Sequence, residues 1–150
     1  MNTASGTAID PSSPRLYEVI NKVIKHAADL FPDEYIHLGG DEVALSVWTS
    51  DAKVAAYLRK QHPGLSLKKA AEAEAYGSFM GKLHTIAAKY QKKIIHWEDV
   101  FDWAGPVESC GGVTPTLSND TIVQVFRGGF GSGPKPCKDQ ALGGCVCGSK

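Results

Sequence analysis

The chain has 150 residues, a length that suits one modest domain, and 43% of them are hydrophobic, as in an ordinary globular protein. Its 16 Lys and Arg residues balance 16 Asp and Glu residues without forming a basic stripe, which argues against a nucleic-acid partner. No apolar run is long enough to span a membrane. Residues 1–6 lack the charged and apolar parts of a signal peptide, so we expect either a cytosolic protein or a true N-terminus upstream.

The first predicted element is a helix that follows an irregular lead-in over residues 1–13. Ser13 can cap this helix, and Pro14 suits its first position. Pro32 predicts its end near Leu30. Apolar residues recur between these limits at helical spacing, namely Leu16, Ile20, Val23, Ile24, Ala27, Leu30 and Phe31.

A short strand over residues 35–39 comes next, and two carboxylates follow it. The Gly39-Gly40 pair ends the strand, because glycine adopts backbone angles closed to other residues and lets a ligand approach closely. Asp41 and Glu42 follow at once. Acids at the tip of a buried strand are costly to desolvate, and burial and mutual repulsion push their pKa values apart, as in acid–base sites. On spacing alone, a solvated acidic loop stays open as the alternative.

Two helices are predicted after the acids. Thr49 or Ser50 can cap one that runs to about Lys60. A longer helix covers about residues 66–90, and we expect its apolar stripe to be core packing and His84 beside it to be partly exposed. The stripe consists of Tyr76, Phe79, Met80, Leu83, Ile86, Ala87 and Tyr90.

Two further strands complete the pattern. Residues 94–97 end in Glu98 and Asp99, and residues 121–126 follow a Gly- and Pro-rich connection over 105–116. Strands separated by long helices pair in parallel through right-handed crossovers. The sequence therefore predicts an α/β fold, a partial (β/α)8 TIM barrel of about three parallel strands with flanking helices and a site at their carboxyl ends.

The four cysteines all lie in the last third of the chain. Their spacing does not match a zinc pattern, so we predict no metal site, while free thiols and loop disulfides both stay open. We expect residues 1–127 to form the partial barrel and residues 128–150 a disordered Gly/Pro/Cys-rich tail. The cysteines are Cys110, Cys137, Cys145 and Cys147.

The string His37-Leu38-Gly39-Gly40-Asp41-Glu42 resembles the His-x-Gly-Gly-Asp-Glu signature of family-20 glycoside hydrolases, the β-N-acetylhexosaminidases. The resemblance runs from Asp10 to Arg127 and makes the chain similar to the middle part of the family's catalytic barrel. It also rests on Asp10-Pro11, Phe31-Pro32-Asp33-Glu34-Tyr35, Trp48, residues 97–102 and residues 120–125.

The resemblance implies removal of terminal non-reducing N-acetyl-β-hexosamine (GlcNAc or GalNAc) from glycans or glycoconjugates. In such retaining, substrate-assisted catalysis, the sugar's own 2-acetamido oxygen replaces the usual carboxylate nucleophile. Glu42 would be the general acid and then the base, a double role that suits a pKa raised toward neutrality. Asp41 would orient the acetamide and stabilise the developing positive charge. No cofactor is implied.

The resemblance also implies the substrate-binding residues. Trp97 would form a wall of the sugar pocket, and Phe126 stands where the family usually has tryptophan. We expect His37 to order the strand end, Asp99 and Trp48 to support the site, and His96 to be structural. The substrate-binding residues implied in this way are Trp97, His37, Asp99 and Phe126.

Several sugar-binding groups of the family have no counterpart in this sequence. They are an early arginine and the tyrosine and acid of later strands. The alternative is therefore a non-catalytic, truncated or degenerate hexosaminidase fragment, at most a weak carbohydrate binder. A homo-oligomer stays open, and the resemblance implies a lysosomal, vacuolar or secreted location.

Overall fold

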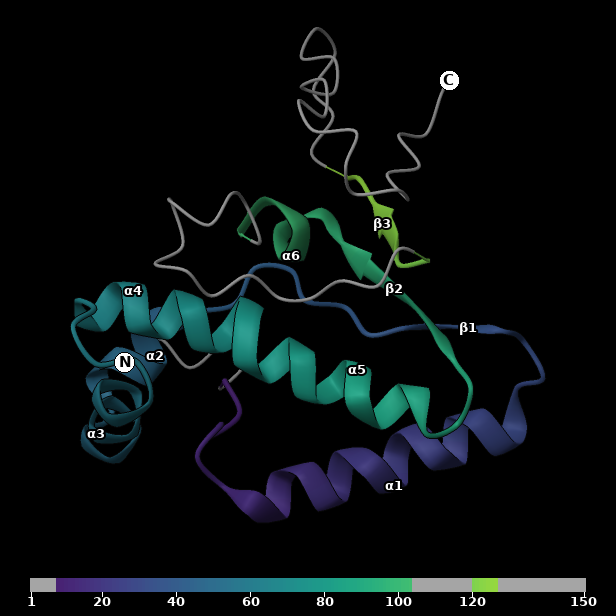
Figure 1. Ribbon diagram of the computed structural model, residues 1–150, viewed down its shortest axis with the longest axis horizontal. Coiled ribbons are helices and arrows are strands. Elements are labelled where there is room, and N and C mark those ends of the chain that lie inside the picture. The colour runs from purple at the N-terminus through teal and green to yellow at the C-terminus, as the bar shows by residue number, and fades with distance from the viewer. Residues whose placement is uncertain (1–7, 104–119, 127–150) are drawn as a thin grey trace, which may run out of the picture.

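A computed structural model describes residues 8–103 and 120–126, which fold as a small parallel sheet with a layer of helices (Figure 1). The strands are β1 (Tyr35–His37), β2 (Lys93–Trp97) and β3 (Ile122–Gln124). They lie in the order β1-β2-β3, and both neighbouring pairs are parallel. The predicted partial TIM barrel with three parallel strands is therefore confirmed, with β1 and β3 shorter than expected.

Some predictions concern residues that the structure does not describe. The Gly- and Pro-rich connection over residues 105–116 and the tail over 128–150 lie outside the described ranges, and so do all four cysteines. No helix in the described ranges is long and apolar enough to cross a membrane.

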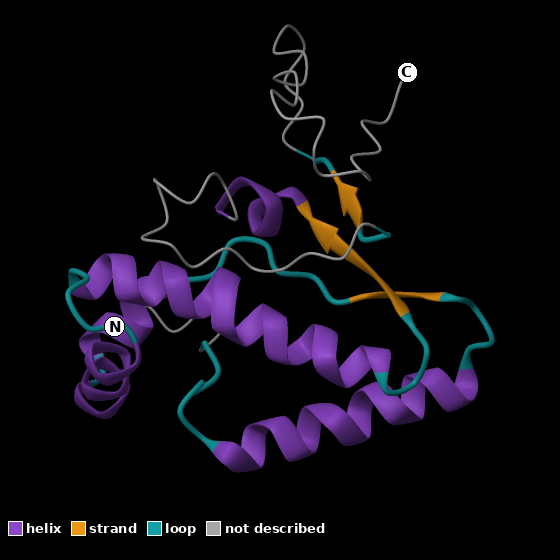
Figure 2. Cartoon of the chain, in the orientation of Figure 1, coloured by secondary structure: helices purple, strands orange, loops and turns teal. Residues whose placement is uncertain are grey.

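Helix α1 (Pro14–Leu30) packs beside α5 (Met80–Ala88), and both lie against one face of the sheet (Figure 2). A buried cluster that contains Ile24 of α1, Ile86 of α5 and Ile94 of β2 joins these three elements. The predicted ends of α1 are correct, and Ser13 stands at its N-cap, although the serine side chain makes no capping hydrogen bond. Only part of its apolar stripe is buried, since Val23, Leu30 and Phe31 are each more than 60% exposed.

The segment after the acids forms two helices, α2 (Leu45–Ser50) and α3 (Ala52–Gln61), where the sequence predicted one. Thr49 and Ser50 lie inside α2, so the prediction that one of them caps α3 is wrong. Asp51 has that role, because its extended backbone separates the helices and its side chain accepts a backbone N–H of the first turn at 2.9 Å.

The predicted long helix is present as three consecutive segments. They are α4 (Leu67–Glu72), the π-helix η1 (Ala73–Phe79) and α5. Ser66 caps the first of them by accepting the Lys69 N–H at 3.3 Å. The wide π turn was not predicted, since apolar spacing does not distinguish it from an α-helix. It places Ala73 to Gly77 in the interior, including one carboxylate.

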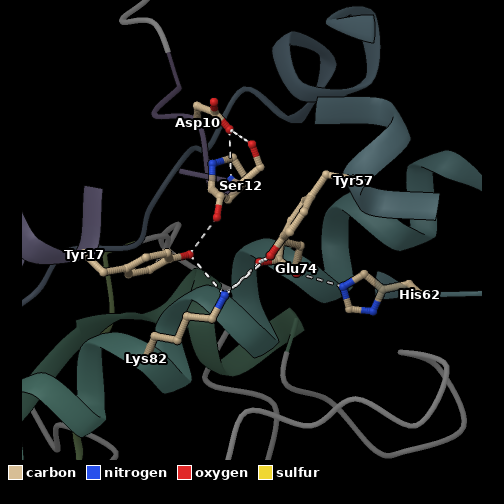
Figure 3. A network of polar contacts seen from close by, with 8 residues as sticks. Asp10, Ser12, Tyr17, Tyr57, His62, Glu74 and Lys82 are labelled. Atoms are coloured by element: carbon tan, nitrogen blue, oxygen red, sulfur yellow. Dashed lines mark hydrogen bonds and ion pairs between the residues drawn. The ribbon is translucent and has the colours of Figure 1, made fainter. Parts of the chain in front are cut away.

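That carboxylate, Glu74, is fully buried and is the centre of a polar network (Figure 3). It accepts a hydrogen bond from the Tyr57 hydroxyl at 3.0 Å and pairs with His62 Nε2 at 2.9 Å. Lys82 Nζ lies 3.6 Å from the carboxylate and donates to the Tyr17 hydroxyl at 3.2 Å. Burial, with the Glu74 charge beside it, raises the pKa of Tyr57 to about 12. The network therefore joins α1, α3, η1 and α5.

Replacing Glu74 with alanine tests how much this network contributes to the stability of the fold. The substitution removes the acceptor of the Tyr57 hydroxyl and the buried partner of His62 and of the half-exposed Lys82, so we expect the free energy of unfolding in urea to fall by about 1 to 3 kcal/mol. The control Glu18→Ala removes an exposed carboxylate of α1, and its effect should stay within about 0.5 kcal/mol. Equal effects of the two substitutions would contradict a central role for the network.

Candidate active site

The candidate site begins where β1 ends against β2. Beyond the strand itself, the Leu38 N–H donates to the Ile95 carbonyl at 2.9 Å, and the Trp97 N–H donates to the Gly39 carbonyl at 3.2 Å. Pairing with β2 therefore continues as far as Gly39, two residues before the first acid.

The chain then makes a turn through left-handed backbone conformations. The φ angles are +69° at Gly39, +104° at Gly40 and +46° at Glu42. A Cβ atom at Gly40 would overlap the Val100 side chain and lie 3.1 Å from Met80 Cε, so the site requires glycine. Glu42 adopts the left-handed region without that freedom, at a cost of about 1 to 3 kcal/mol, and such strained residues cluster at active sites.

Both acids are exposed to solvent, so the expectation that they lie at a buried strand tip is wrong. β1 is an edge strand of the described sheet and is itself only half-buried, with neighbours on one side. The local geometry is therefore that of the alternative that the sequence left open, a solvated acidic loop.

Three residues expected in the sugar pocket meet in one aromatic row. The rings of His37 and Trp97 lie 4.8 Å apart at 55°, and the rings of Trp97 and Phe126 lie 5.4 Å apart at 75°. The row brings together the ends of all three strands, with Trp97 half-buried and Phe126 43% exposed. His37 Nδ1 also accepts the Gly39 N–H at 2.9 Å, so this ring orders the start of the turn.

Asp99 and Trp48 do not lie in this row. Asp99, in α6 (Glu98–Trp103), is only 3% exposed. Trp48 of α2 is 4% exposed, and its indole N–H donates to the Ile9 carbonyl at 2.9 Å. Their burial favours support of the site over contact with a ligand.

The contact between His84 and His96, next to the Gly39 carbonyl, was not predicted from the sequence. His96 is fully buried, its Nδ1 lies 3.0 Å from the Gly39 carbonyl, and its Nε2 lies 2.7 Å from His84 Nε2. Burial lowers the pKa of His96 to about 4, and it also lowers the pKa of His84, against an opposing effect of Asp120. The structure confirms that His84 is partly exposed, but no helical or strand period signals that it meets His96.

In the described ranges, no three His, Cys, Asp or Glu side chains come together as a metal site. The candidate site comprises a carboxylate pair on a strained turn, an aromatic row at the strand ends, and a histidine pair that contacts the Gly39 carbonyl.

The pKa of His96 predicts a pH-dependent stability. The unfolded chain binds this proton below its ordinary pKa of 6.5, whereas the folded chain binds it only near pH 4. Stability is thus fully present above pH 6.5 and is lost as the pH falls toward 4, by on the order of 3 kcal/mol.

Urea unfolding of the wild type and of His96→Asn, at about pH 7.5 and about pH 5, measures this effect. Asparagine keeps a donor for Gly39 and does not titrate, so the variant should lose less stability between the two pH values. An equal loss in both proteins would show that His96 is not the group responsible.

Comparisons with known proteins give this site a context. The family model "Glycosyl hydrolase family 20, catalytic domain" matches residues 2–138. The chain is 34% identical over 119 residues to human beta-hexosaminidase subunit beta, which covers 79% of this chain and 19% of the relative. It is 32% identical over 125 residues to bovine beta-hexosaminidase subunit alpha, with coverages of 82% and 21%. The chain thus spans about a fifth of the length of these curated relatives.

Solved structures agree with this match. A GH20 exo-β-N-acetylglucosaminidase from Vibrio harveyi, crystallised with N-acetylglucosamine, superposes with a TM-score of 0.59 at 28% identity. Flavobacterium johnsoniae chitobiase gives the same TM-score at 26% identity. Each match covers 81% of this chain and 16% of the other.

Proposed function

Because this chain belongs to glycosyl hydrolase family 20, we propose that it is a catalytic segment of a β-N-acetylhexosaminidase. Its reaction is the removal of terminal non-reducing N-acetyl-β-hexosamine from glycans or glycoconjugates. The observation that carries this proposal is the position of the acid pair: Asp41 and Glu42 follow Gly39, whose N–H bonds to His37 and whose carbonyl bonds to Trp97. Gly39, the first residue of the turn, is therefore bonded to two residues of the aromatic row.

In the first step, the acetamido oxygen of the substrate attacks the anomeric carbon as the bond to the leaving oxygen breaks. Glu42 gives its proton to that leaving oxygen, and an oxazolinium-type intermediate forms. Asp41 accepts a hydrogen bond from the acetamide N–H, which holds the nucleophilic oxygen in place. Its negative charge stabilises the positive charge that develops on the ring.

In the second step, water attacks the anomeric carbon and gives a proton to Glu42. The bond from the anomeric carbon to the acetamide oxygen breaks, which restores the acetamide, and the configuration of the sugar is retained. Glu42 ends protonated, as it began. An exposed carboxylate on a turn is accessible both to the leaving group and to the attacking water.

The aromatic row supplies the apolar surface for the sugar. The half-buried Trp97 ring packs against the C–H face of the sugar or its acetamide methyl, between His37 and Phe126. Asp99, two residues after Trp97 and almost fully buried in α6, supports the end of β2. In this proposal His37, Trp97 and Phe126 line the binding pocket, and Asp99 supports it from the interior.

The substitution Glu42→Gln tests the proposal. Loss of the general acid should lower hydrolysis of a chromogenic N-acetyl-β-glucosaminide by about 10²- to 10⁴-fold, and most for substrates with poor leaving groups. The matched control is Glu34→Gln, which changes an exposed carboxylate before β1 and should leave the rate unchanged. Equal rates in wild type and Glu42→Gln would exclude Glu42 as acid and base.

A second function, weak glycan binding without hydrolysis, is favoured by one observation. Both acids are exposed, and Phe126 is 43% exposed, whereas electrostatic catalysis is strongest in a site that excludes water. On this account the wild type is as inactive as Glu42→Gln, although N-acetylglucosamine still binds. The assay above therefore separates the two functions.

A further inference from the structure

The hydrogen-bond chemistry of Gly39 fixes the protonation of the histidine pair. A carbonyl oxygen only accepts hydrogen bonds, so His96 Nδ1, 3.0 Å from the Gly39 oxygen, must carry a hydrogen and donate it. His96 is fully buried, which favours the neutral ring with a single N–H. Its Nε2 is then a bare acceptor.

The acceptor on His96 in turn fixes His84. The two Nε2 atoms are 2.7 Å apart, and the rings stack at 5.0 Å and 20°. Because one of the two nitrogens must donate, His84 carries its hydrogen on Nε2. The hydrogen bonds therefore run in one direction, from His84 to His96 and from His96 to the Gly39 carbonyl.

We propose that His84 is a positioning residue for the acid pair. Its Nε2–H holds His96 in the Nδ1–H tautomer, and His96 holds the Gly39 carbonyl at the start of the turn that carries Asp41 and Glu42. His84 belongs to α5, so this contact connects the helical layer to the strand ends. The inference rests on the proposed function only for the consequence to catalysis, not for the hydrogen bonds themselves.

The strain of the turn explains why such support matters. A left-handed residue such as Glu42, at φ +46°, persists only where its surroundings hold it there. The Gly39 carbonyl receives two donors, the Trp97 N–H and His96 Nδ1, and only the second depends on a side chain. Without His84, the His96 ring is free to move its hydrogen to Nε2 and release the carbonyl.

Three variants of the whole chain test this role. His84→Leu removes the donor, His84→Gln replaces it with an amide N–H, and the control His26→Leu removes an exposed histidine of α1. We expect kcat for an N-acetyl-β-glucosaminide to fall about tenfold or more in His84→Leu, with little change in KM. His84→Gln should recover most of the loss, and His26→Leu should match the wild type.

Nitrogen-15 NMR of the imidazole rings gives a measurement that does not need activity. In the wild type, His96 should show hydrogen on Nδ1 and His84 on Nε2, and the backbone amide signals of Asp41 and Glu42 should move in His84→Leu but not in His26→Leu. The opposite tautomers would overturn the proposal, and so would unmoved amide signals.

The kinetic and NMR results separate the possible failures. If kcat falls as far in His84→Gln as in His84→Leu, the packing of His84 matters rather than its hydrogen bond, and the proposal is wrong. If the wild type does not hydrolyse the substrate, the proposed function fails, and the NMR measurement still decides whether His84 positions the turn. If His84→Leu does not fold, the wild-type tautomers decide it: hydrogen on His96 Nδ1 and on His84 Nε2 supports the proposal, and the opposite tautomers overturn it.

Discussion

The Gly39 carbonyl is the acceptor on which the geometry of the candidate site depends. β1 has only three residues and lies at an edge of the described sheet, so its own ladder fixes little beyond His37. The bond from the Trp97 N–H extends the pairing to Gly39, and the bond from His96 adds a contact from the side. The strained turn that carries the acids therefore starts from Gly39, whose backbone bonds to both His37 and Trp97.

Two kinds of interaction hold the helical layer that lies behind this point. The apolar cluster that includes Ile24, Ile86 and Ile94 stabilises the packing of α1 and α5 against β2. This stabilisation is roughly proportional to the apolar area that the cluster buries. The Glu74 network adds directional contacts among α1, α3, η1 and α5, where a misplaced helix would leave buried charge without a partner. A defined helical layer fixes where α5 lies, and therefore where His84 meets His96.

Much of the fold could be predicted from the sequence, because each element has its own period and end signals. The strands, α1 and the long helix are near their predicted places, and three expected pocket residues meet at the strand ends. The break at Asp51 was missed because three neighbouring residues could each cap a helix. The exposure of Asp41 and Glu42, the Glu74 network and the histidine pair depend on contacts between elements, which periodicity within one element does not report.

The most direct test of a hexosamine site beside the acid pair is an NMR titration of the nitrogen-15-labelled chain with N-acetylglucosamine. The indole N–H of Trp97 and the amides of Asp41 and Glu42 should shift together and saturate. The indole N–H of Trp48, buried and bonded to the Ile9 carbonyl, should stay in place and serve as the internal control. No shift at Trp97, or equal shifts at Trp48 and Trp97, would contradict the account.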